Sequence, residues 1–572
     1  MKGAKKLLVQ AFSGNSQSII PLVLLGCVVG VVAGIVMASF VTLLNLVLGL
    51  LNGASLEDFE SLTPSWRFGL PVLGSCLLIL LYRFTPSTAQ VAGLPYVLER
   101  LHYGSGRFPW KNTVFQFFAA LISLGSGHSV GREGPAVHLG SGIASLLGQY
   151  THRPPSQLRL LVGCGTAAAI SAAFNTPLAG VLFAMEVVLM EYSILGFAPI
   201  IAAAISASAF TGILLGPNSV LSPTRLALAD YGDIPSLLFT GVWIGLIAVL
   251  FHQLIRLFLR FPLPSRAIKL LLAGLITGSL ALLAPEILGS GYDTINATLS
   301  SEIPWSWLLV ILAAKLIATA AAIGLGVPGG QIAPMLVLGV CAGGLAGALV
   351  PGDSPAGLYA LLGMAAMMAA MLHAPLAALA TILELSLSAE VMFPGMTVVL
   401  TATMISQYVF RQPSLMITML KARGRFLETH PLRTALAQRY LSELVSFRFA
   451  QLDIAQVDAE HLERVLALPL PWIVVHQEQS CYLLSKQGLE QAYLDYQQQS
   501  LTLTVAEMLT PLLTANRVVK KLDTDASLLT ALKSLEQQEE VAGFLLPTAR
   551  FGEGLVTRRR LMRMLTLDNP LH

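Results

Sequence analysis

The chain has 572 residues, of which 55% are apolar and only 12% are charged, and its formal net charge at pH 7 is +3. A soluble domain carries about 25% charged residues, so the composition excludes an ordinary soluble protein, and the small net charge gives no reason to expect a nucleic-acid partner. The five cysteines form no CxxC pair, so neither a disulfide framework nor a metal site is expected.

Membrane-spanning helices are the first elements that the sequence predicts. No charged residue lies between Lys6 and Glu57, and the runs 161–185 and 192–224 are also uncharged. Such runs reach the ~20 apolar residues that a helix needs to cross a bilayer. Helices are favoured because every backbone group in lipid must be paired within the protein.

Three pairs of segments in the apolar region match at a nearly constant offset. They are Ala92–Leu94 with Ser290–Tyr292, Gly131–Gly140 with Gly330–Gly339, and Pro177–Glu186 with Pro375–Glu384. Three matches in the same order at one spacing indicate an internal duplication. The apolar region is therefore predicted to consist of two homologous halves, 18–215 and 234–410.

The repeated segments carry the signals of helix starts. Glycines are followed by a proline within Gly131–Pro135 and within Gly329–Pro334, and Gly93 precedes Leu94-Pro95. Proline suits a first helical turn, and a helix N-terminus attracts anions because its N–H groups are unpaired. In transporters with two such halves, broken helices point their N-termini at the substrate. Several such ends would hold an anion without a full positive charge, so that the ion can leave again.

The composition changes towards the carboxyl end. Charged and polar residues become frequent from Arg411 onward, and no further apolar span follows. One small soluble domain is predicted at 425–572. Periodicity predicts the order helix, strand, strand, helix twice. The predicted elements are 461–468, 472–476, 481–485 and 488–496, then 527–537, 542–547, 554–557 and 559–565.

Positive residues predict that both ends of the chain lie in the cytoplasm, since short loops rich in Lys and Arg stay on that side. The N-terminal segment 1–17 contains Lys2, Lys5 and Lys6. The end of the apolar region carries Arg411, Lys421, Arg423 and Arg425.

Five segments resemble signatures of the CLC family of chloride channels and transporters. They are Ala92–Pro95 (AGLP), Gly131–Pro135 (GREGP), Ala172–Val187 (AAFNTPLAGVLFAMEV), Gly329–Pro334 (GGQIAP) and Ser414–Gly424 (SLMITMLKARG). The resemblance implies an all-α polytopic membrane domain at 18–424, with about eighteen helical segments in two inverted halves. It also implies a homodimer with one pore per subunit, located in the cell membrane with both termini inside. The tail at 425–572 resembles a paired CBS domain, a small α/β unit.

The resemblance also implies which residues hold the anion. Glu133 matches the family's gating glutamate, whose carboxylate competes with the anion for the same donors until protonation or voltage releases it. Arg132 is expected to pair locally and hold its loop. The positions expected to form the anion site are Ala92, Gly93, Leu94, Pro95, Gly131, Arg132, Gly134, Pro135, Gly330, Gln331, Ile332, Ala333, Pro334 and Met416.

Four positions depart from the family pattern. Ala92 and Met416 stand where a serine and a tyrosine hydroxyl are usual, and Ile332 stands where a phenylalanine is usual. The central anion would therefore depend on backbone N–H groups at 331–333 and on helix dipoles. Val187 occupies the place of the internal glutamate that passes protons in exchangers, and valine cannot carry a proton.

Two further charged residues lie inside the apolar region. Glu186, next to Val187, is expected to have a structural role like that of its counterpart Glu384. Lys315 lies within an apolar run, and we expect it either to line an aqueous vestibule or to extend to the membrane surface.

The tail also departs from its family. CBS domains hold a nucleotide ribose with a Ser or Thr that is followed three residues later by Asp. Here Ser485 is followed by Gly488, and Thr557 is followed by Arg560. We therefore expect no bound nucleotide and no other cofactor.

These observations favour a passive, gated pathway for chloride and similar small anions that is weakly or not coupled to protons. Val187 favours this function, and a chloride/proton antiporter is the alternative. A remote alternative is an intramembrane enzyme, because Ser126, His128 and Ser129 lie near the gate. No oriented base accompanies these residues, and the GREGP segment explains their setting without catalysis.

Overall fold

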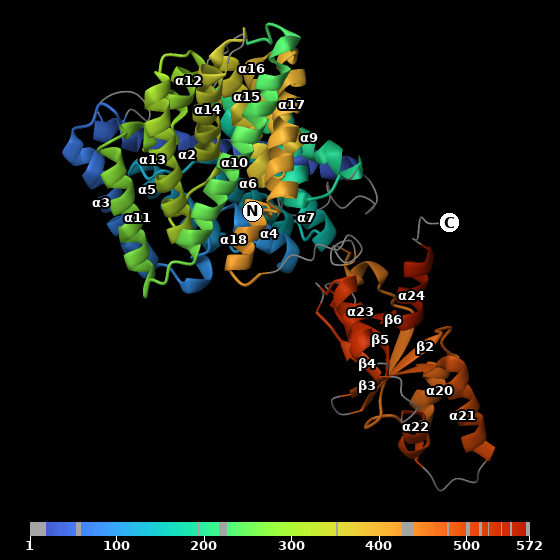
Figure 1. The fold of residues 1–572 in the computed structure, drawn as a ribbon. Coiled ribbons are helices and arrows are strands. Elements are labelled where there is room, and N and C mark those ends of the chain that lie inside the picture. The colour runs from blue at the N-terminus through green and yellow to red at the C-terminus, as the bar shows by residue number, and fades with distance from the viewer. Residues whose placement is uncertain are drawn as a thin grey trace. The chain divides into compact units, whose positions relative to one another are not determined.

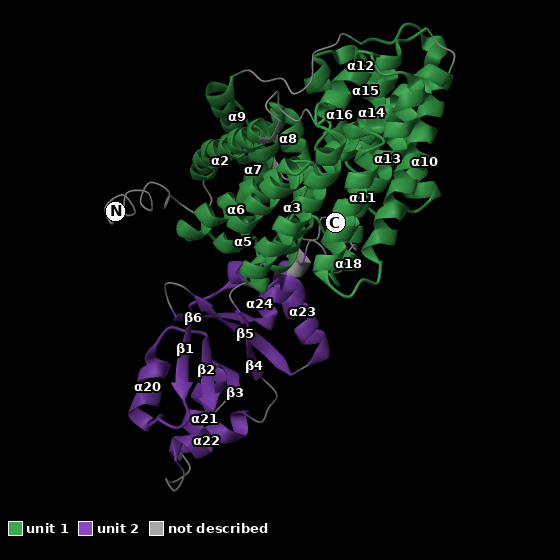
Figure 2. Cartoon of the chain, turned by 90° about the vertical axis from the view of Figure 1, so that its left-hand side faces the viewer, with its two compact units in different colours: residues 1–427 green, residues 428–572 purple. Residues whose placement is uncertain are grey.

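The computed structural model describes residues 19–52, 59–192, 194–216, 226–350, 353–425, 436, 439–477, 480–498, 504–513, 518–523, 526–538, 540–548 and 552–567. The predicted segment 1–17 lies outside these residues. The chain divides into two compact units, Met1–Leu427 and Glu428–His572, which Figure 2 shows in different colours. Each unit has hydrophobic core clusters of its own.

The first unit is helical, and the two halves of its sequence contain a similar succession of α-helices, although a π-helix follows α8 in the first half and α17 in the second (Figure 1). The first half contains α2 (Ile20–Asn52), α3 (Pro64–Phe84), α4 (Leu94–Tyr103), α5 (Trp110–Gly125), α6 (Glu133–Tyr150), α7 (Pro155–Phe174), α8 (Pro177–Phe183), the π-helix η2 (Ala184–Leu189) and α9 (Ile194–Leu215). The second half contains α10 (Ile234–Leu259), α11 (Arg266–Ala281), α12 (Tyr292–Leu299), α13 (Trp305–Leu325), α14 (Ile332–Leu349), α15 (Ala356–Leu372), α16 (Pro375–Ser386), α17 (Met392–Thr403) and the π-helix η6 (Met404–Val409). The last helix is α18 (Leu415–Ala422), and short 3-10 turns precede four helices: η1 (Ser87–Ala89), η3 (Tyr231–Asp233), η4 (Pro285–Ile287) and η5 (Ala389–Val391).

Eight helical segments among the described residues are long and apolar enough to cross a membrane. They are Ile20–Leu50, Pro64–Phe84, Pro155–Phe174, Gly196–Leu215, Tyr231–Leu259, Trp305–Leu325, Ile332–Leu349 and Ala389–Val409. Shorter apolar helices accompany them: Pro177–Leu189, Ala356–Leu372 and Pro375–Ser386. Helices too short to cross alone are tolerated at membrane depth where neighbouring protein covers their ends.

The backbone itself repeats between the two halves. Asn175 and His373 end α7 and α15 in the left-handed conformation, with φ of 59° and 58°. Non-glycine residues adopt this conformation rarely, so its occurrence at matching positions indicates a common backbone path. Gly93 and Gly291 precede α4 and α12 with φ of 83° and 80°, which glycine adopts without strain, but their ψ angles differ, at -179° and 34°.

Small residues bring the central helices of each half together. A Cβ on Gly140 of α6 would lie 2.2 Å from the carbonyl oxygen of Gly165 on α7, and one on Gly339 of α14 would lie 2.4 Å from that of Gly363 on α15. Close backbone approach through small residues is how membrane helices gain packing contacts. Any side chain at these positions would displace α6 or α14, whose N-termini form the site described below.

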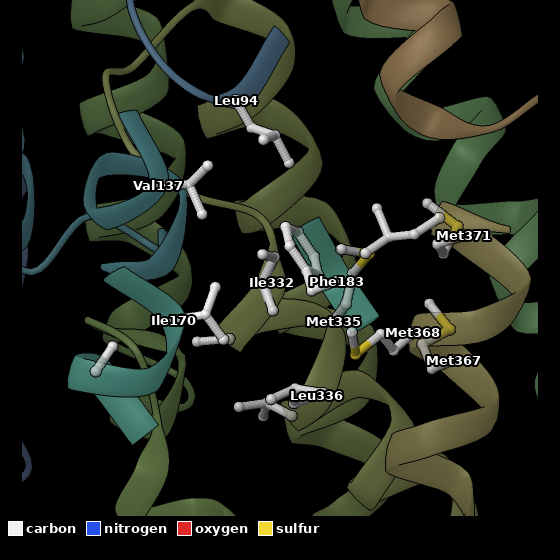
Figure 3. Packing of buried hydrophobic residues seen from close by; sticks show 14 of the residues in the cluster. Leu94, Val137, Ile170, Phe183, Ile332, Met335, Leu336, Met367, Met368 and Met371 are labelled. Atoms are coloured by element: carbon white, nitrogen blue, oxygen red, sulfur yellow. The ribbon is translucent and has the colours of Figure 1, made fainter. Parts of the chain in front are cut away.

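The apolar core combines both halves of the first unit. Figure 3 shows Phe183 of α8 beside Ile332 and Met335 of α14, with methionines of α15 on the other side of Met335. All of these side chains belong to one buried cluster.

The second unit is a small α/β domain with one six-stranded sheet in the order β1-β2-β3-β4-β5-β6. Its strands are β1 (Phe449–Asp453), β2 (Trp472–Gln477), β3 (Ser480–Ser485), β4 (Val518–Lys521), β5 (Val541–Thr548) and β6 (Gly552–Thr557). Its helices are α20 (Ala459–Ala467), α21 (Lys486–Gln498), α22 (Val505–Leu513), α23 (Leu528–Gln537) and α24 (Arg558–Leu567), and η7 (Leu441–Leu444) is a short 3-10 turn before β1. The pairs β1–β2 and β4–β5 are parallel, whereas β2–β3 and β5–β6 are antiparallel. The order helix, strand, strand, helix, which the sequence predicts twice in this domain, is therefore confirmed. The elements β1, β4 and α22 were not predicted.

Candidate anion pathway

Two glycine-rich loops cross where α6 and α14 begin. The N–H of Gly131 donates to the carbonyl of Gly330 at 2.6 Å, and the N–H of Gly330 donates to the carbonyl of Gly131 at 2.7 Å. A Cβ on Gly134 would lie 2.6 Å from the Cα of Gly330, so only glycine permits this approach. Since α6 begins at Glu133 and α14 at Ile332, the bridge brings two helix N-termini together.

The carboxylate of Glu133 lies at this junction. Its side chain is 0% exposed. Oε2 accepts a hydrogen bond from the N–H of Ala333 at 3.1 Å, and Oε1 accepts one from the hydroxyl of Tyr292. Ala333 belongs to the first turn of α14, whose N–H groups have no partner within the helix. The carboxylate therefore occupies a position that offers a small anion the same donors.

Arg132 stands beside this carboxylate. Its Nε lies 3.9 Å from Oε1 of Glu133, and its guanidinium lies over the ring of Tyr292, 4.9 Å from the ring centroid. It also donates to the carbonyl of Ala173 at the end of α7 at 3.3 Å. The expectation that Arg132 pairs locally is confirmed by these contacts.

The side chains of Gln331 and Met416 meet next to this junction. The amide nitrogen of Gln331 donates to the sulfur of Met416 at 3.4 Å, and both residues are buried. Ile332, which corresponds to Glu133 in the repeat, packs beside Phe183 (Figure 3). A thioether is a weak acceptor and has no proton to donate, so this region offers an anion no hydroxyl from Met416.

The loop before α4 is held in place by α5. The N–H of Gly93 donates to Oε1 of Gln116 at 2.8 Å. The amide of Asn112 donates to the carbonyls of Ala89 and Val91. The Gly93 N–H, one of the expected anion donors, is thus already bonded to a neutral side chain.

Two cavities are lined by residues near Glu133 in the chain or in the site, although Glu133 itself lines neither of them. The larger holds about 460 Å³ and is lined by Ala92, Gly93, Pro95, Gly329 and Gln331, together with the arginines Arg266, Arg423 and Arg425. The smaller holds about 70 Å³, and Arg132 is part of its lining. Glu133 lies between residues that line the two cavities. It follows Arg132 of the smaller cavity in the chain, and it bonds to Ala333, two residues after Gln331 of the larger cavity.

Comparison with known sequences identifies the family. The family profile described as "Voltage gated chloride channel" matches residues 73–407, more than half of the chain. The chain belongs to the voltage-gated chloride channel (CLC) family. The chain is also 33% identical over 352 residues to a "Putative chloride channel protein ClcB-like" of Ralstonia nicotianae, covering 59% of this chain and 82% of that protein. It is 28% identical over 430 residues to an "H(+)/Cl(-) exchange transporter ClcA" of Yersinia pestis, covering 72% and 90%.

Solved structures confirm the CLC fold. A slow cyanobacterial Cl⁻/H⁺ antiporter matches with a TM-score of 0.63 and 22% identity, over 72% of this chain and 99% of that chain. A eukaryotic CLC transporter matches with a TM-score of 0.60 and 18% identity, over 94% and 97%. The predicted fold, a helical polytopic CLC domain followed by a small α/β domain, is therefore confirmed. This CLC protein is a multi-pass membrane protein that transports chloride, and it is not an enzyme.

Val187, which the resemblance predicts at the position of the internal glutamate of exchangers, lies on a π-helix in this CLC protein. Val187 belongs to η2 and is buried. The neighbouring carboxylate of Glu186 accepts hydrogen bonds from the N–H groups of Leu376 and Ala377 at 3.3 and 2.8 Å, at the start of α16. Glu186 is therefore engaged as a helix cap.

Glu384 makes the same contacts in reverse. Its carboxylate accepts from the N–H groups of Leu178 and Ala179 at 2.9 and 2.7 Å, at the start of α8. Each half of the CLC domain thus caps a helix of the other half. The expected structural role of Glu186 and Glu384 is confirmed by this exchange.

The expectation for Lys315 was wrong. Its side chain is 0% exposed, so it neither lines a vestibule nor extends to the membrane surface. Its Nζ donates to the carbonyls of Ile287 and Gly289 at 2.9 and 3.1 Å, in the loop before α12. A buried ammonium needs such partners, and here the loop carbonyls satisfy it.

Tyr292 is the residue of the site that the sequence did not reveal. It lies 159 residues from the carboxylate that it contacts. The signal that could have indicated it is the repeat, because Tyr292 corresponds to Leu94 and places a hydroxyl where the first half has a hydrocarbon.

Proposed function

We propose that this CLC protein is a gated, passive pathway for chloride and similar small anions, weakly or not coupled to protons. The observation that carries the proposal is Val187, a buried hydrocarbon at the position of the internal proton-passing glutamate. Its carboxylate neighbour Glu186 caps α16, so it does not take over that position. The ClcB-like relative, which is named a putative chloride channel, supports the same mode.

Glu133 is the gate in this proposal. With its carboxylate bonded to the Ala333 amide, the protein's own anion occupies the donors that chloride needs. Protonation removes the negative charge and weakens these bonds, so the side chain can leave and chloride can take its place. Anion flux is then expected to rise as the pH falls.

The two cavities supply the approaches to this gate. Arg266, Arg423 and Arg425 line the larger cavity together with Glu99, which pairs with Arg425 at 3.0 Å. The net positive charge of this lining raises the local concentration of anions. This cavity reaches Gly93 and Gln331, which are among the proposed anion-site residues. Arg132, which precedes Glu133 in the chain, lines the smaller cavity.

A chloride/proton exchanger is the second candidate. Relatives named H⁺/Cl⁻ exchange transporters align over 72% of this chain, and Glu133 could carry protons on one side of the pathway. The two modes differ in whether a chloride gradient moves protons against their own gradient.

Reconstitution into liposomes separates the two modes. With a chloride gradient and a potassium ionophore to set the voltage, external pH and chloride are followed together. We expect chloride efflux with little or no proton uptake, in the parent protein and in a Glu133→Gln control that lacks the gate. Proton pumping at a fixed ratio to chloride in the parent protein would show that the chain is an exchanger.

The arrangement in the membrane is part of the proposal. We infer a homodimer with a separate pathway in each subunit, as the resemblance to the CLC family implies. We place 18–424 in the cell membrane and 1–17 and 425–572 in the cytoplasm, on the basis of the flanking Lys and Arg residues. Chemical cross-linking in liposomes tests the dimer, and protease digestion of intact spheroplasts, which should spare the tail, tests the orientation.

The cytoplasmic domain is proposed to bind no nucleotide. Ser485 and Thr557 use their hydroxyl oxygens to accept from the N–H groups of Gly488 and Arg560, both at 3.3 Å. These positions hold no carboxylate for a ribose. Calorimetric titration with ATP and AMP is expected to give no heat of binding, and saturable binding would contradict the proposal.

A further inference from the structure

The hydroxyl of Tyr292 lies on the gate carboxylate. Tyr292 is the first residue of α12 and is buried, with 8% exposure. It donates to Oε1 of Glu133, while the amide of Ala333 donates to Oε2. Each carboxylate oxygen thus has one donor, and the two donors come from different helices of the second half.

The ring of Tyr292 is fixed independently of its hydroxyl. The guanidinium of Arg132 lies over one face, 4.9 Å from the ring centroid. Phe174 at the end of α7 packs against it edge-on, with centroids 6.1 Å apart. Both contacts involve only the ring, so a phenylalanine would retain them.

The backbone of Tyr292 is also held firmly. Gly291 precedes it with a φ of 80°. The loop before that glycine is bonded through the carbonyls of Ile287 and Gly289 to the buried ammonium of Lys315. The hydroxyl is therefore presented to Glu133 from a rigid support.

We propose that Tyr292 is a positioning residue that holds the Glu133 carboxylate in the closed position and so sets the proton concentration at which the pathway opens. The inference rests on the proposed gating role of Glu133. A hydroxyl that donates to a carboxylate stabilises its ionised form, and this bond must break before the side chain can leave. We call this hydrogen bond from Tyr292 to Glu133 the latch. Tyr292 corresponds to Leu94 in the repeat, and leucine has no hydroxyl, so the first half offers no such donor at this position.

Three other charged or titratable groups lie in the elements around the gate. Arg132, in the same loop, lies 3.9 Å from the carboxylate. Lys315 on α13 is bonded to the loop carbonyls. His128, earlier in the same loop, contacts the hydroxyl of Ser75 on α3. The Tyr292→Phe substitution leaves all three in place.

Chloride flux from liposomes as a function of pH tests the latch. Without the hydroxyl, the ionised gate loses one of its donors and opens at a lower proton concentration. For Tyr292→Phe we expect the midpoint of the flux–pH profile to rise by about one pH unit, which corresponds to roughly tenfold higher flux on the steep part of the curve. Tyr359→Phe, a buried tyrosine on α15, is the matched control and should leave the profile unchanged.

Two further variants show whether an unexpected result contradicts the role of Tyr292 or the proposed gating role of Glu133. Tyr292→Leu, which copies the first half of the repeat, should shift the midpoint in the same direction. In a Glu133→Gln background, Tyr292→Phe should have no further effect on pH dependence. An unchanged midpoint in Tyr292→Phe, with a flat profile in Glu133→Gln, overturns the latch but keeps the gate. A persistent pH dependence in Glu133→Gln overturns the proposed gate itself.

Discussion

The two halves of the membrane domain share a backbone but differ in the chemistry that holds it. In the first half, the loop before α4 is bonded to the neutral amides of Asn112 and Gln116 on α5. In the second half, the loop before α12 is bonded to the buried ammonium of Lys315 on α13. The same short helix follows in each case, so the geometry of the repeat does not depend on one kind of polar partner.

The residues at the crossing of the two loops differ even more. The first half contributes Arg132 and Glu133, and the second contributes Gln331 and Ile332 at the corresponding positions. The first half contributes Leu94 where the second contributes Tyr292. In the proposed pathway, the titratable gate therefore lies on one half and the donors that hold it lie on the other. This asymmetry gives the two approaches to the gate different properties.

Removing the carboxylate of Glu133, whose counterpart in the second half is the uncharged Ile332, should have the largest effect on anion flux. Glu133→Gln makes the first half resemble the uncharged second half at this position. Because the group that competes with chloride no longer titrates, flux at neutral pH should rise by about tenfold and lose most of its pH dependence. Liposome flux between pH 5 and pH 8 measures both quantities. A profile that keeps the parent's slope would place the gate elsewhere.

The hydrogen bonds that hold the loops before α4 and α12 differ in number, so breaking them should lower the stability of the protein by different amounts. Lys315→Met leaves two buried carbonyls without a donor, which should cost roughly 2–6 kcal/mol, since each orphaned group costs about 1–3 kcal/mol. Gln116→Leu orphans one N–H, that of Gly93, and should cost about half as much. Thermal unfolding in detergent, followed by size-exclusion chromatography, compares the two variants. Equal losses would mean that the number of orphaned backbone groups does not set the cost.

The exchanged helix caps predict equal effects in the two halves. Glu186→Gln and Glu384→Gln each weaken two bonds between a carboxylate and helix N–H groups, at a cost of about 1 kcal/mol. The same unfolding assay should rank the two variants together. If only Glu186→Gln impaired transport, and did so without loss of stability, Glu186 would have a role beyond capping.

The smallest expected effect concerns the hydroxyls that the central site lacks. Ala92→Ser restores a donor on the first half, and part of the 1.5–3 kcal/mol of a hydrogen bond to a charged ion should appear as about fivefold tighter chloride binding. Chloride, which is more strongly hydrated than nitrate, should gain more from this donor. Calorimetric titration and flux in chloride and nitrate measure the change. Tight chloride binding and exclusion of nitrate by the parent protein would show that backbone amides alone suffice.

Much of this protein could be predicted from local patterns in its sequence. The long uncharged runs indicated membrane helices, the constant offset between matching segments indicated two halves, and glycine followed by proline indicated the starts of α4, α6 and α14. In the tail, β2, β3, β5 and β6 and their helices lie where alternation and helical periodicity predicted them. The short strands β1 and β4 were missed because their strongest stabilisation is parallel pairing with β2 and β5, which no local pattern records.

Only the tertiary structure decided which groups become partners. The bridge between Gly131 and Gly330 joins loops about two hundred residues apart, and only folding brings Tyr292 to Glu133. The burial of Lys315 and the exchange of caps between Glu186 and Glu384 were likewise hidden. Composition and periodicity report the environment that each residue prefers. The pairing of a particular donor with a particular acceptor depends on where the packed helices carry them.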